Sequence, residues 1–409
     1  MARFCGRIPL LILIGALFGS TFAADLQTPK AVIPDSYFGL HIHHLVSPVP
    51  TPWPNIPVPQ WRLWDASVNW PDLEPSKGQW RFENLDAYVS LAQQHRTRLL
   101  LPLGGSPRWA SARPSEPSNY YPGFRAEPAN IEDWRTFVRT VVSRYKGRIQ
   151  AYEIWNEPNL KDFWTGTTDQ MLTLTKEASQ IIHSVDPHAI VVSPSATADY
   201  GIPWLVEFLK KGGGQFVDVI GYHFYVNPNT KLPEEMVPVI QRVRQVISES
   251  GSGNKPLWNT EMGWLPPAQF DSEEVAAGFL ARAFILGWAA GVQRFYWYAW
   301  DNRFLAIVTY KEEEHRVTPA GTAYKVMQQW LIGAKMAGCT ESSDHIWTCQ
   351  LNRSRKQQWI VWNPHGTRKF DVPAAWHIKS ATPLLHDRRS LNGTSIEIGP
   401  APTLLTGRS

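Results

Sequence analysis

The chain has 409 residues, of which 43% are hydrophobic and 19% are charged. This balance suffices to bury a sizeable core and excludes a disordered chain. The formal net charge of +4 comes without a dense run of Lys or Arg, so nucleic-acid binding is not expected. The 20 Trp residues stand out, because an indole offers a flat apolar face to a ligand as well as to a core.

Residues 1–24 have the pattern of a secretory signal peptide. Arg3 and Arg7 supply the positive end, residues 9–18 form a short apolar run, and residues 21–23 offer a small-x-small cleavage site. We expect secretion, to the extracellular space or the periplasm, with retention as an N-terminal anchor as the alternative. No later segment approaches the ~20 apolar residues of a membrane span, so we expect no membrane partner for the mature chain.

Two cysteines remain once the signal peptide, which contains Cys5, is removed. Cys339 and Cys349 are separated by a stretch with turn-forming residues at 342–344. An even pair of cysteines in an oxidising compartment predicts a local disulfide rather than a catalytic thiol.

Short β-rich runs alternate with longer helical patterns, which predicts a parallel sheet with crossover helices. The stretches 85–95 and 131–144 are helical examples, with apolar residues at three-to-four spacing. The pattern indicates an α/β fold, a (β/α)8 TIM barrel over residues 25–333. A doubly wound sheet is the alternative, but the Gly-rich phosphate loop usual after its first strand is absent from the sequence. The predicted strands are 38–43, 60–64, 98–103, 149–155, 189–193, 217–223, 256–260 and 294–298.

After residue 333 the pattern changes to short runs of alternating polarity. Strands are predicted at 345–350, 358–362, 369–372 and 395–398, with turn residues between them. Residues 334–409 are therefore expected to form a small antiparallel, β-sandwich-like domain. A unit of this size would be marginal alone, so we expect it to pack on the barrel.

A glutamate stands at the tip of each of two predicted strands. Glu157 follows the fourth strand in Asn-Glu-Pro, and Glu261 follows the seventh in Thr-Glu-Met. The active site of a TIM barrel lies at the C-terminal ends of its strands, where strands four and seven face one another. Two carboxyl groups flanking the scissile bond are what glycoside hydrolysis requires, and their separation decides between retention and inversion.

The run 153–159, Glu-Ile-Trp-Asn-Glu-Pro-Asn, together with Glu261 resembles clan A of the retaining (β/α)8 glycoside hydrolases. Family 39, with β-xylosidases, α-L-iduronidases and exopolysaccharide hydrolases, is the most similar, and family 5 is the second choice. The resemblance covers most of residues 35–333. It implies hydrolysis of β-glycosidic bonds in an oligo- or polysaccharide through a covalent glycosyl-enzyme. Glu157 is then the acid/base and Glu261 the nucleophile, with no metal or organic cofactor.

The resemblance also implies supporting roles for four polar residues. Arg62 matches the arginine that hydrogen-bonds the nucleophile, and Asn156 matches the residue that holds the sugar 2-hydroxyl. In His-Phe-Tyr at 223–225, Tyr225 would hydrogen-bond Glu261 and His223 would orient its neighbours. Because hydrogen-bond donors favour the charged form of a carboxylate, we expect Arg62 and Tyr225 to keep Glu261 ionised.

Three tryptophans are candidate sugar platforms. The clan has a tryptophan from strand eight on the floor of the subsite at the reacting sugar, and Trp300 is the best match, with Trp297 as the rival. Trp109 and Trp264 follow the third and seventh strands, and we expect them to contact the substrate.

His41 and His43 end the first predicted strand, and both point the same way. We expect them to hydrogen-bond sugar hydroxyls. The alternative is a metal-dependent amidohydrolase barrel that also uses His223 and Asp301, but strand five supplies no histidine for that set. A non-catalytic carbohydrate-binding barrel is a further alternative, although both glutamates and the arginine are present.

Overall fold

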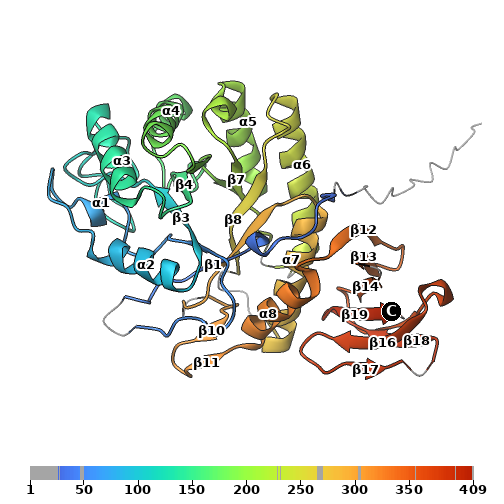
Figure 1. Ribbon diagram of the computed structural model, residues 1–409. Helices are drawn as coiled ribbons and strands as arrows, with labels where there is room; N and C mark the ends of the chain where they lie inside the picture. Colours follow the sequence, from blue (N-terminus) through green and yellow to red (C-terminus); the bar gives the residue numbers. More distant parts are fainter. Residues whose placement is uncertain are drawn as a thin grey trace, which may run out of the picture.

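The larger part of the protein is a ring of parallel strands surrounded by helices (Figure 1). The computed structural model describes residues 26, 28–46, 50–227, 229–230, 232–264, 270–302, 305–354, 356–391 and 393–407. The signal peptide predicted at residues 1–24 lies outside these ranges. Among the described residues, no helix combines the length and the apolar character needed to cross a membrane.

All strand pairings in the barrel are parallel, and the helices follow the strands in the order that the sequence predicts. The strands are β1 (Phe38–His41), β2 (Gln60–Arg62), β3 (Arg98–Leu103), β4 (Ala151–Ile154), β5 (Ile190–Val192), β6 (Ala196–Thr197), β7 (Ile220–His223), β8 (Leu257–Gly263) and β9 (Arg294–Tyr298). The helices are α1 (Trp70–Leu73), α2 (Glu83–Gln94), α3 (Ile131–Tyr145), α4 (Thr168–Val185), α5 (Ile202–Lys210), α6 (Met236–Glu249), α7 (Glu273–Ala289) and α8 (Pro319–Leu331).

The strand predicted at 189–193 is present as β5, which pairs with β4, and a further short strand that was not predicted, β6, follows it and pairs with β7. Pro194 separates the two strands and has no N–H to donate to the ladder. The ring nevertheless closes at this point, because Val192 and Val219 form a parallel bridge and the N–H of Ser193 donates to Val219 at 3.0 Å. The predicted (β/α)8 barrel is thus confirmed.

Alternation along β9 shows how the strands distribute their side chains. Tyr296 packs inside the barrel with Leu100 and Trp258. Its neighbour Trp297 points outward and contacts Phe279 of α7, with ring centroids 6.3 Å apart. Since successive strand residues face opposite sides, Tyr298 lies on the inner side again, at the mouth of the barrel.

The C-terminal residues form two antiparallel sheets that share a small core, which confirms the predicted β domain. The six-stranded sheet has the order β12-β13-β14-β19-β16-β17, and β15 pairs with β18. Four of these strands match the predicted ones. The other four, β12, β16, β17 and β19, were not predicted, because β17 has only two residues and Lys, Ala, Gly or Pro interrupts the strand pattern in the rest. The strands are β12 (Lys335–Glu341), β13 (Trp347–Arg353), β14 (Lys356–Trp362), β15 (Arg368–Asp371), β16 (Ile378–Pro383), β17 (Arg389–Ser390), β18 (Ser395–Ile398) and β19 (Thr403–Gly407).

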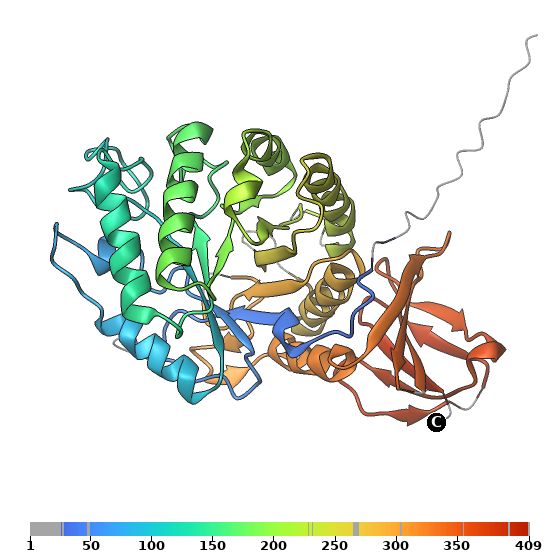
Figure 2. The ribbon, with the colours of Figure 1, turned by 45° about the horizontal axis from the view of Figure 1, so that its top comes forward.

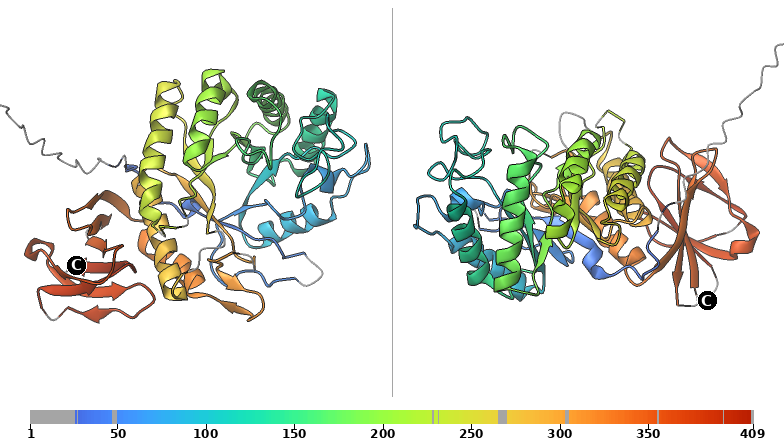
Figure 3. Two further views of the ribbon diagram at one scale, coloured as in Figure 1. Left: turned by 180° about the vertical axis from the view of Figure 1, so that it is seen from behind. Right: turned by 90° about the horizontal axis from the view of Figure 1, so that it is seen from above.

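Cys339 of β12 and Cys349 of β13 stand opposite each other in the sheet and are joined by a disulfide, as predicted. The domain lies beside α7 and α8 (Figures 2 and 3). The segment before β1 reaches the junction as well, since Ile33 exchanges backbone hydrogen bonds with Gly333 and Ala334 at 2.9 and 2.8 Å.

A buried charge cluster joins the two parts of the molecule. Arg282 of α7 is 2% exposed, and its Nη1 lies 2.8 Å from both carboxylate oxygens of Glu234. The indole Nε1 of Trp362 on β14 donates to the same carboxylate at 2.8 Å. The domain therefore contributes a hydrogen bond to an ion pair whose guanidinium is buried and whose carboxylate is 12% exposed.

Replacing Glu234 with Ala should leave the buried guanidinium of Arg282 without a counter-charge. Removal of one partner from a buried pair typically costs about 3–5 kcal/mol, so the free energy of unfolding should fall by roughly this amount in a urea titration. The control is Glu207→Ala, whose exposed partner is Lys211, and it should leave the unfolding midpoint unchanged. Equal midpoints for both variants would contradict the structural role of the buried pair.

Candidate active site

Glu157 and Glu261 face each other at the C-terminal ends of β4 and β8. One carboxylate oxygen of each and a ring nitrogen of His223 all lie within 4.8 Å of one another. Both glutamates line a pocket of about 720 Å³. The two glutamates are 104 positions apart in sequence, but the barrel brings the ends of their strands together at one mouth.

Arg62 at the end of β2 fixes the carboxylate of Glu261. Its Nη1 donates to Glu261 Oε2 at 2.7 Å, its Nη2 to Asn156 Oδ1 at 2.7 Å, and its Nε to Glu153 Oε2 at 2.5 Å. The side chain of Arg62 is fully buried. The rigid planar fork of the guanidinium thereby sets the relative position of three groups that lie on or directly after β4 and β8.

Glu153 was not predicted as part of the site, although it begins the quoted motif. It is fully buried and accepts hydrogen bonds from the hydroxyls of Ser195 and Thr260. A carboxylate at an inward-facing strand position must be paired or hydrogen-bonded, and this was the signal available in the sequence. With Glu153 and Glu261 both on Arg62, the cluster holds two carboxylates against one buried guanidinium.

Tyr225 and His223 contact the two glutamates as the resemblance implies. The hydroxyl of Tyr225 donates to Glu261 Oε1 at 3.0 Å, and His223 Nδ1 lies 2.8 Å from Glu157 Oε1. Burial nonetheless raises the pKa of Glu261 to about 6, although the charges of His223 and Arg62 oppose this shift. Desolvation thus outweighs the favourable charges, but a pKa of about 6 leaves Glu261 ionised at neutral pH, as expected for a carboxylate with these donors.

The backbone is strained around Glu157. Trp155 has φ of 65° and Glu157 has φ of 43°, and bulky residues rarely adopt this left-handed region. The N–H of Glu157 is held by Ser195 at 3.0 Å. Strained conformations persist where the surroundings over-determine them, and they cluster at functional sites.

Asp65 is a further carboxylate in the pocket, and the sequence did not single it out for this place. It accepts hydrogen bonds from the hydroxyls of Tyr120 and Tyr298, each at 2.7 Å. Burial, followed by the charge of Asp65, raises the pKa of both tyrosines far above the ordinary value. Both phenols therefore stay protonated and act as donors to Asp65.

Tyr298 occupies the place at the pocket that was expected for Trp300. Trp300 is buried outside the pocket, where it stacks on Tyr310 with ring centroids 5.0 Å apart. The rival Trp297 points outward, toward α7. Neither tryptophan lines the pocket: the alternation along β9 turns Trp297 outward and Tyr298 inward, and Trp300 lies beyond the end of this strand.

The two other predicted platforms differ from each other. Trp264 lines the pocket and packs on Phe270 and Phe279. Trp109 does not line it: its indole donates to the carbonyl of Glu74 at 2.9 Å and lies under the ammonium of Lys77. The expectation for Trp109 is corrected, since the loop after β3 folds this ring against α1.

His41 and His43 also lie outside the lining of the pocket, which corrects their expected contact with sugar hydroxyls. His41 is buried, and its Nε2 lies 3.1 Å from the carbonyl oxygen of Thr260, the residue before Glu261. Burial lowers the pKa of His41 well below its usual range, so the ring is neutral and supports the backbone of β8. His43 Nδ1 lies 2.8 Å from the carbonyl oxygen of Asp301.

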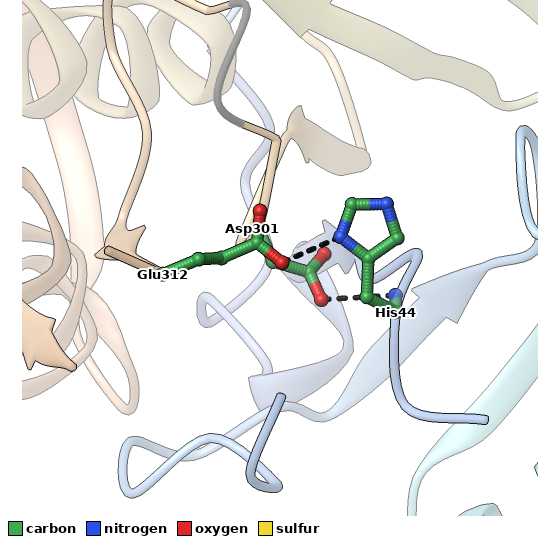
Figure 4. Close-up of side chains that lie close together, drawn as sticks. All are labelled: His44, Asp301 and Glu312. Carbon is green, nitrogen blue, oxygen red and sulfur yellow. Dashed lines mark hydrogen bonds and ion pairs between the residues drawn. The ribbon is translucent and has the colours of Figure 1, made fainter. Parts of the chain in front are cut away.

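The metal-site alternative is not supported by the placement of its residues. The carboxylate of Asp301 accepts the backbone N–H groups of His43 and His44 at 2.7 and 3.0 Å and the hydroxyl of Thr51 at 2.6 Å. His44 in turn lies 2.6 Å from Glu312 (Figure 4). Within the described ranges, no group of potential ligands contains His41 or His43.

A second group with three potential ligand atoms is formed by Glu157, His223 and Glu261. These atoms are already engaged with one another and with the guanidinium of Arg62. A fixed cation therefore already stands beside Glu261, and the donor set is suited to proton transfer and nucleophilic attack.

Two curated bacterial proteins resemble this chain in sequence. It is 27% identical over 224 residues to a beta-xylosidase of Caldicellulosiruptor saccharolyticus, covering 50% of this chain and 45% of that protein. It is 28% identical over 201 residues to a beta-xylosidase of Geobacillus stearothermophilus, covering 43% of this chain and 39% of that one. The matches thus span less than half the length of these relatives.

Solved structures share the whole fold at low sequence identity. A glucosidase of Croceicoccus marinus superposes with a TM-score of 0.67 at 14% identity, over 93% of this chain and 97% of that one. A GH39 beta-xylosidase of Caulobacter crescentus gives 0.66 at 16% identity, over 94% and 99%. The model of the family described as glycosyl hydrolases family 39 matches residues 61–298. This match covers more than half of the chain and includes both glutamates, so the chain belongs to glycosyl hydrolase family 39.

Proposed function

We propose that the protein is a retaining glycosidase that cleaves β-glycosidic bonds by double displacement. The observation that carries the proposal is the approach of Glu157 and Glu261 to within 4.8 Å, oxygen to oxygen, in one pocket. Retaining enzymes hold their two carboxyl groups about 5–5.5 Å apart, whereas inverting enzymes need about 6.5–9.5 Å to admit a water molecule between carboxylate and sugar. Membership of family 39 supports the same conclusion.

In the first step, the ionised carboxylate of Glu261 attacks the anomeric carbon while Glu157 gives its proton to the departing glycosidic oxygen. The bond to the leaving group breaks as the ester to Glu261 forms. In the second step, Glu157 takes a proton from a water molecule, the water oxygen bonds to the anomeric carbon, and the Glu261 carboxylate leaves. Arg62 and Tyr225 stabilise that carboxylate whenever it carries its charge.

The substrate is proposed to be a β-linked oligo- or polysaccharide, with xylose-configured sugars as the first to test. The two bacterial relatives described above are both beta-xylosidases. The pocket supports a carbohydrate, because aromatic side chains border it beside its carboxylates. These aromatic residues are Trp64, Tyr120, Phe163, Tyr200, Tyr225, Trp264 and Tyr298.

We further propose that the protein is secreted, on the basis of the signal-like pattern of residues 1–24. The disulfide between Cys339 and Cys349 supports an oxidising compartment. N-terminal sequencing of the exported protein should start at Ala24 or Asp25, at the end of the predicted signal peptide, and an intact N-terminus on membrane-bound protein would favour the anchor instead.

Replacement of either glutamate should separate the two roles. Glu261→Ala should abolish turnover of aryl β-xylosides, because no ester can form. Glu157→Ala should lower kcat by about 10²–10⁴-fold for substrates with poor leaving groups, and much less for activated ones. Added azide should then give the β-glycosyl azide with Glu157→Ala and the α-anomer with Glu261→Ala.

Proton NMR of the first product formed by the unmodified protein provides the control on stereochemistry. Retention predicts that the β-anomer appears first and then mutarotates. If the α-anomer appears first, the double displacement is wrong. If the protein and Glu261→Gln are equally inert on a panel of β-glycosides while sugar still binds, it is a non-catalytic carbohydrate-binding barrel.

The pH dependence should follow the ionisation of Glu261. With a pKa of about 6, the acidic limb of kcat/KM should lie near pH 6, because the protonated carboxyl group cannot attack. The charge of Asp65 raises this pKa further. Asp65→Asn should therefore move the acidic limb to lower pH.

Asp72→Asn is the matched control for that shift. Asp72 also accepts a tyrosine hydroxyl, from Tyr121 at 2.5 Å, but it does not line the catalytic pocket. It should leave the limb in place. An acidic limb that moves to higher pH in Asp65→Asn would refute the electrostatic assignment.

Tyr200 should bind substrate at the rim of the pocket. Its side chain is 66% exposed and lines the pocket, so its removal does not disturb a core. Tyr200→Ala should raise KM for oligosaccharides roughly fivefold, which corresponds to about 1 kcal/mol of lost stacking. Tyr121→Ala, which removes another exposed tyrosine outside this pocket, should not change KM. Equal KM values in both variants would exclude Tyr200 from substrate binding.

A further inference from the structure

The C-terminal β domain carries a groove of its own, with a volume of about 830 Å³. This is larger than the catalytic pocket, at about 720 Å³. We call it the domain groove. Its walls are the β13–β14 hairpin, the stretch from Val372 to Lys379, the chain just before β18, and Gly407. Nothing in the proposed hydrolysis uses these residues.

Trp376 forms an aromatic wall of the domain groove. Its ring stacks on that of Trp359 with centroids 4.7 Å apart and planes 6° from parallel, and Phe370 lies at 5.9 Å. Trp359 is 5% exposed, whereas Trp376 is half-buried and borders the groove. An indole fixed from behind in this way presents a rigid apolar plane at low entropic cost, on which the C–H face of a sugar ring can pack.

Polar groups line the domain groove together with this ring. Amide side chains come from Asn352 and Gln357, and hydroxyls from Ser354 and Thr394. Such groups both donate and accept hydrogen bonds, as the hydroxyls of a sugar require. The combination of one aromatic plane with several hydrogen-bonding groups matches a carbohydrate better than a purely apolar ligand.

The charge of the domain groove indicates which class of carbohydrate it binds. Lys356, His377 and Lys379 line it and are exposed, and none of them has an ion-pair partner in the described part of the chain. Among the described residues that line the groove, none is a carboxylate. Unpaired cations gathered in a concave surface attract an anion.

We propose that the domain groove is a second carbohydrate-binding site that takes a segment of an acidic glycan. One sugar ring packs on Trp376, and a carboxylate of the glycan binds near Lys356 and Lys379. The catalytic pocket has the opposite character, since Asp65, Glu157, Asp199 and Glu261 line it. The acidic portion of a polymer thus binds the domain groove and a neutral portion enters the catalytic pocket.

The domain groove and the catalytic pocket lie at opposite ends of the barrel. Arg353, in the β13–β14 hairpin, donates to the carbonyls of Gln329 and Trp330 at 3.2 and 3.1 Å, at the C-terminal end of α8. Barrel helices run antiparallel to the strands, so this end lies beside the N-terminal ends of the strands, away from the mouth. The groove can therefore hold the enzyme on a polymer without occupying the catalytic pocket. This tethering rests on the proposed function, whereas the binding itself does not.

The experiment measures glycan binding to the full chain carrying Glu261→Gln, so that no probe is hydrolysed. The probes are polygalacturonate as the acidic glycan and arabinoxylan as the neutral one. Their binding is measured by affinity electrophoresis and by calorimetry. The double variant Lys356→Ala/Lys379→Ala changes only exposed side chains and should bind polygalacturonate at least tenfold more weakly. Trp376→Ala should weaken it similarly.

The control is Lys369→Ala, an exposed lysine of β15 that pairs with Asp371 outside the groove; it should bind within twofold of the parent. Unchanged polygalacturonate binding in the double variant, or equal affinity for both probes, overturns the proposal. With Glu261 restored, the double variant should hydrolyse aryl β-xylosides at the normal rate, and a loss there would show that the groove is not a separate site. Inertness of the unmodified protein on all β-glycosides would refute the glycosidase but not the groove.

Discussion

The geometry of the active site depends on one buried cation, the guanidinium of Arg62. It hydrogen-bonds Glu261, Glu153 and Asn156, which lie on or directly after β8 and β4. An isolated guanidinium in the interior would be prohibitively costly, and so would either carboxylate. Each of these charges is tolerated only because the others are there, so the cluster fixes the relative position of β2, β4 and β8 at the mouth of the barrel.

The same cluster explains why Glu261 is poised rather than permanently ionised. Two buried carboxylates share the charge of Arg62, so it neutralises neither of them completely. The effect of burial therefore exceeds the opposing effect of the positive charges and raises the pKa of Glu261 to about 6. A nucleophile that is ionised near neutral pH, yet weakly enough solvated to attack, is what the first step of the proposed double displacement requires. The imbalance of charge in the cluster thus contributes to reactivity as well as to structure.

The sequence predicted what depends on strand order and on local motif. The strand tips that carry Glu157 and Glu261 follow from hydrophobic patterning, and the barrel then brings them together whatever their separation in the chain. The sequence could not predict which aromatic residue of β9 faces the pocket. Trp297, Tyr298 and Trp300 have similar hydrophobic character, and a shift of one residue in a strand reverses inside and outside.

Asp65 and the histidines were mispredicted or overlooked for a related reason. Their roles depend on contacts with residues far away in sequence. The position of Asp65 is fixed by hydrogen bonds from Tyr120, in the loop after β3, and from Tyr298 of β9. The ring of His41 is fixed by the carbonyl oxygen of Thr260. From the sequence alone, a histidine whose ring faces a ligand cannot be distinguished from one whose ring faces the backbone. Only packing decides, and here the mouth of the barrel is already filled by Tyr298, whose ring lies against both His41 and His43.

The opposite charges of the catalytic pocket and the domain groove suggest a role for the C-terminal domain. A pocket lined by Asp65, Glu157 and Glu261 repels an acidic sugar, and in the proposed mechanism two of these carboxylates act on the reacting centre and cannot be replaced by cations. An enzyme acting on a polymer with acidic substituents must therefore hold those substituents elsewhere. The proposed groove, with its lysines and indole on a domain that is hydrogen-bonded to the barrel through Trp362 and Glu234, would meet that need without changing the chemistry at the mouth of the barrel.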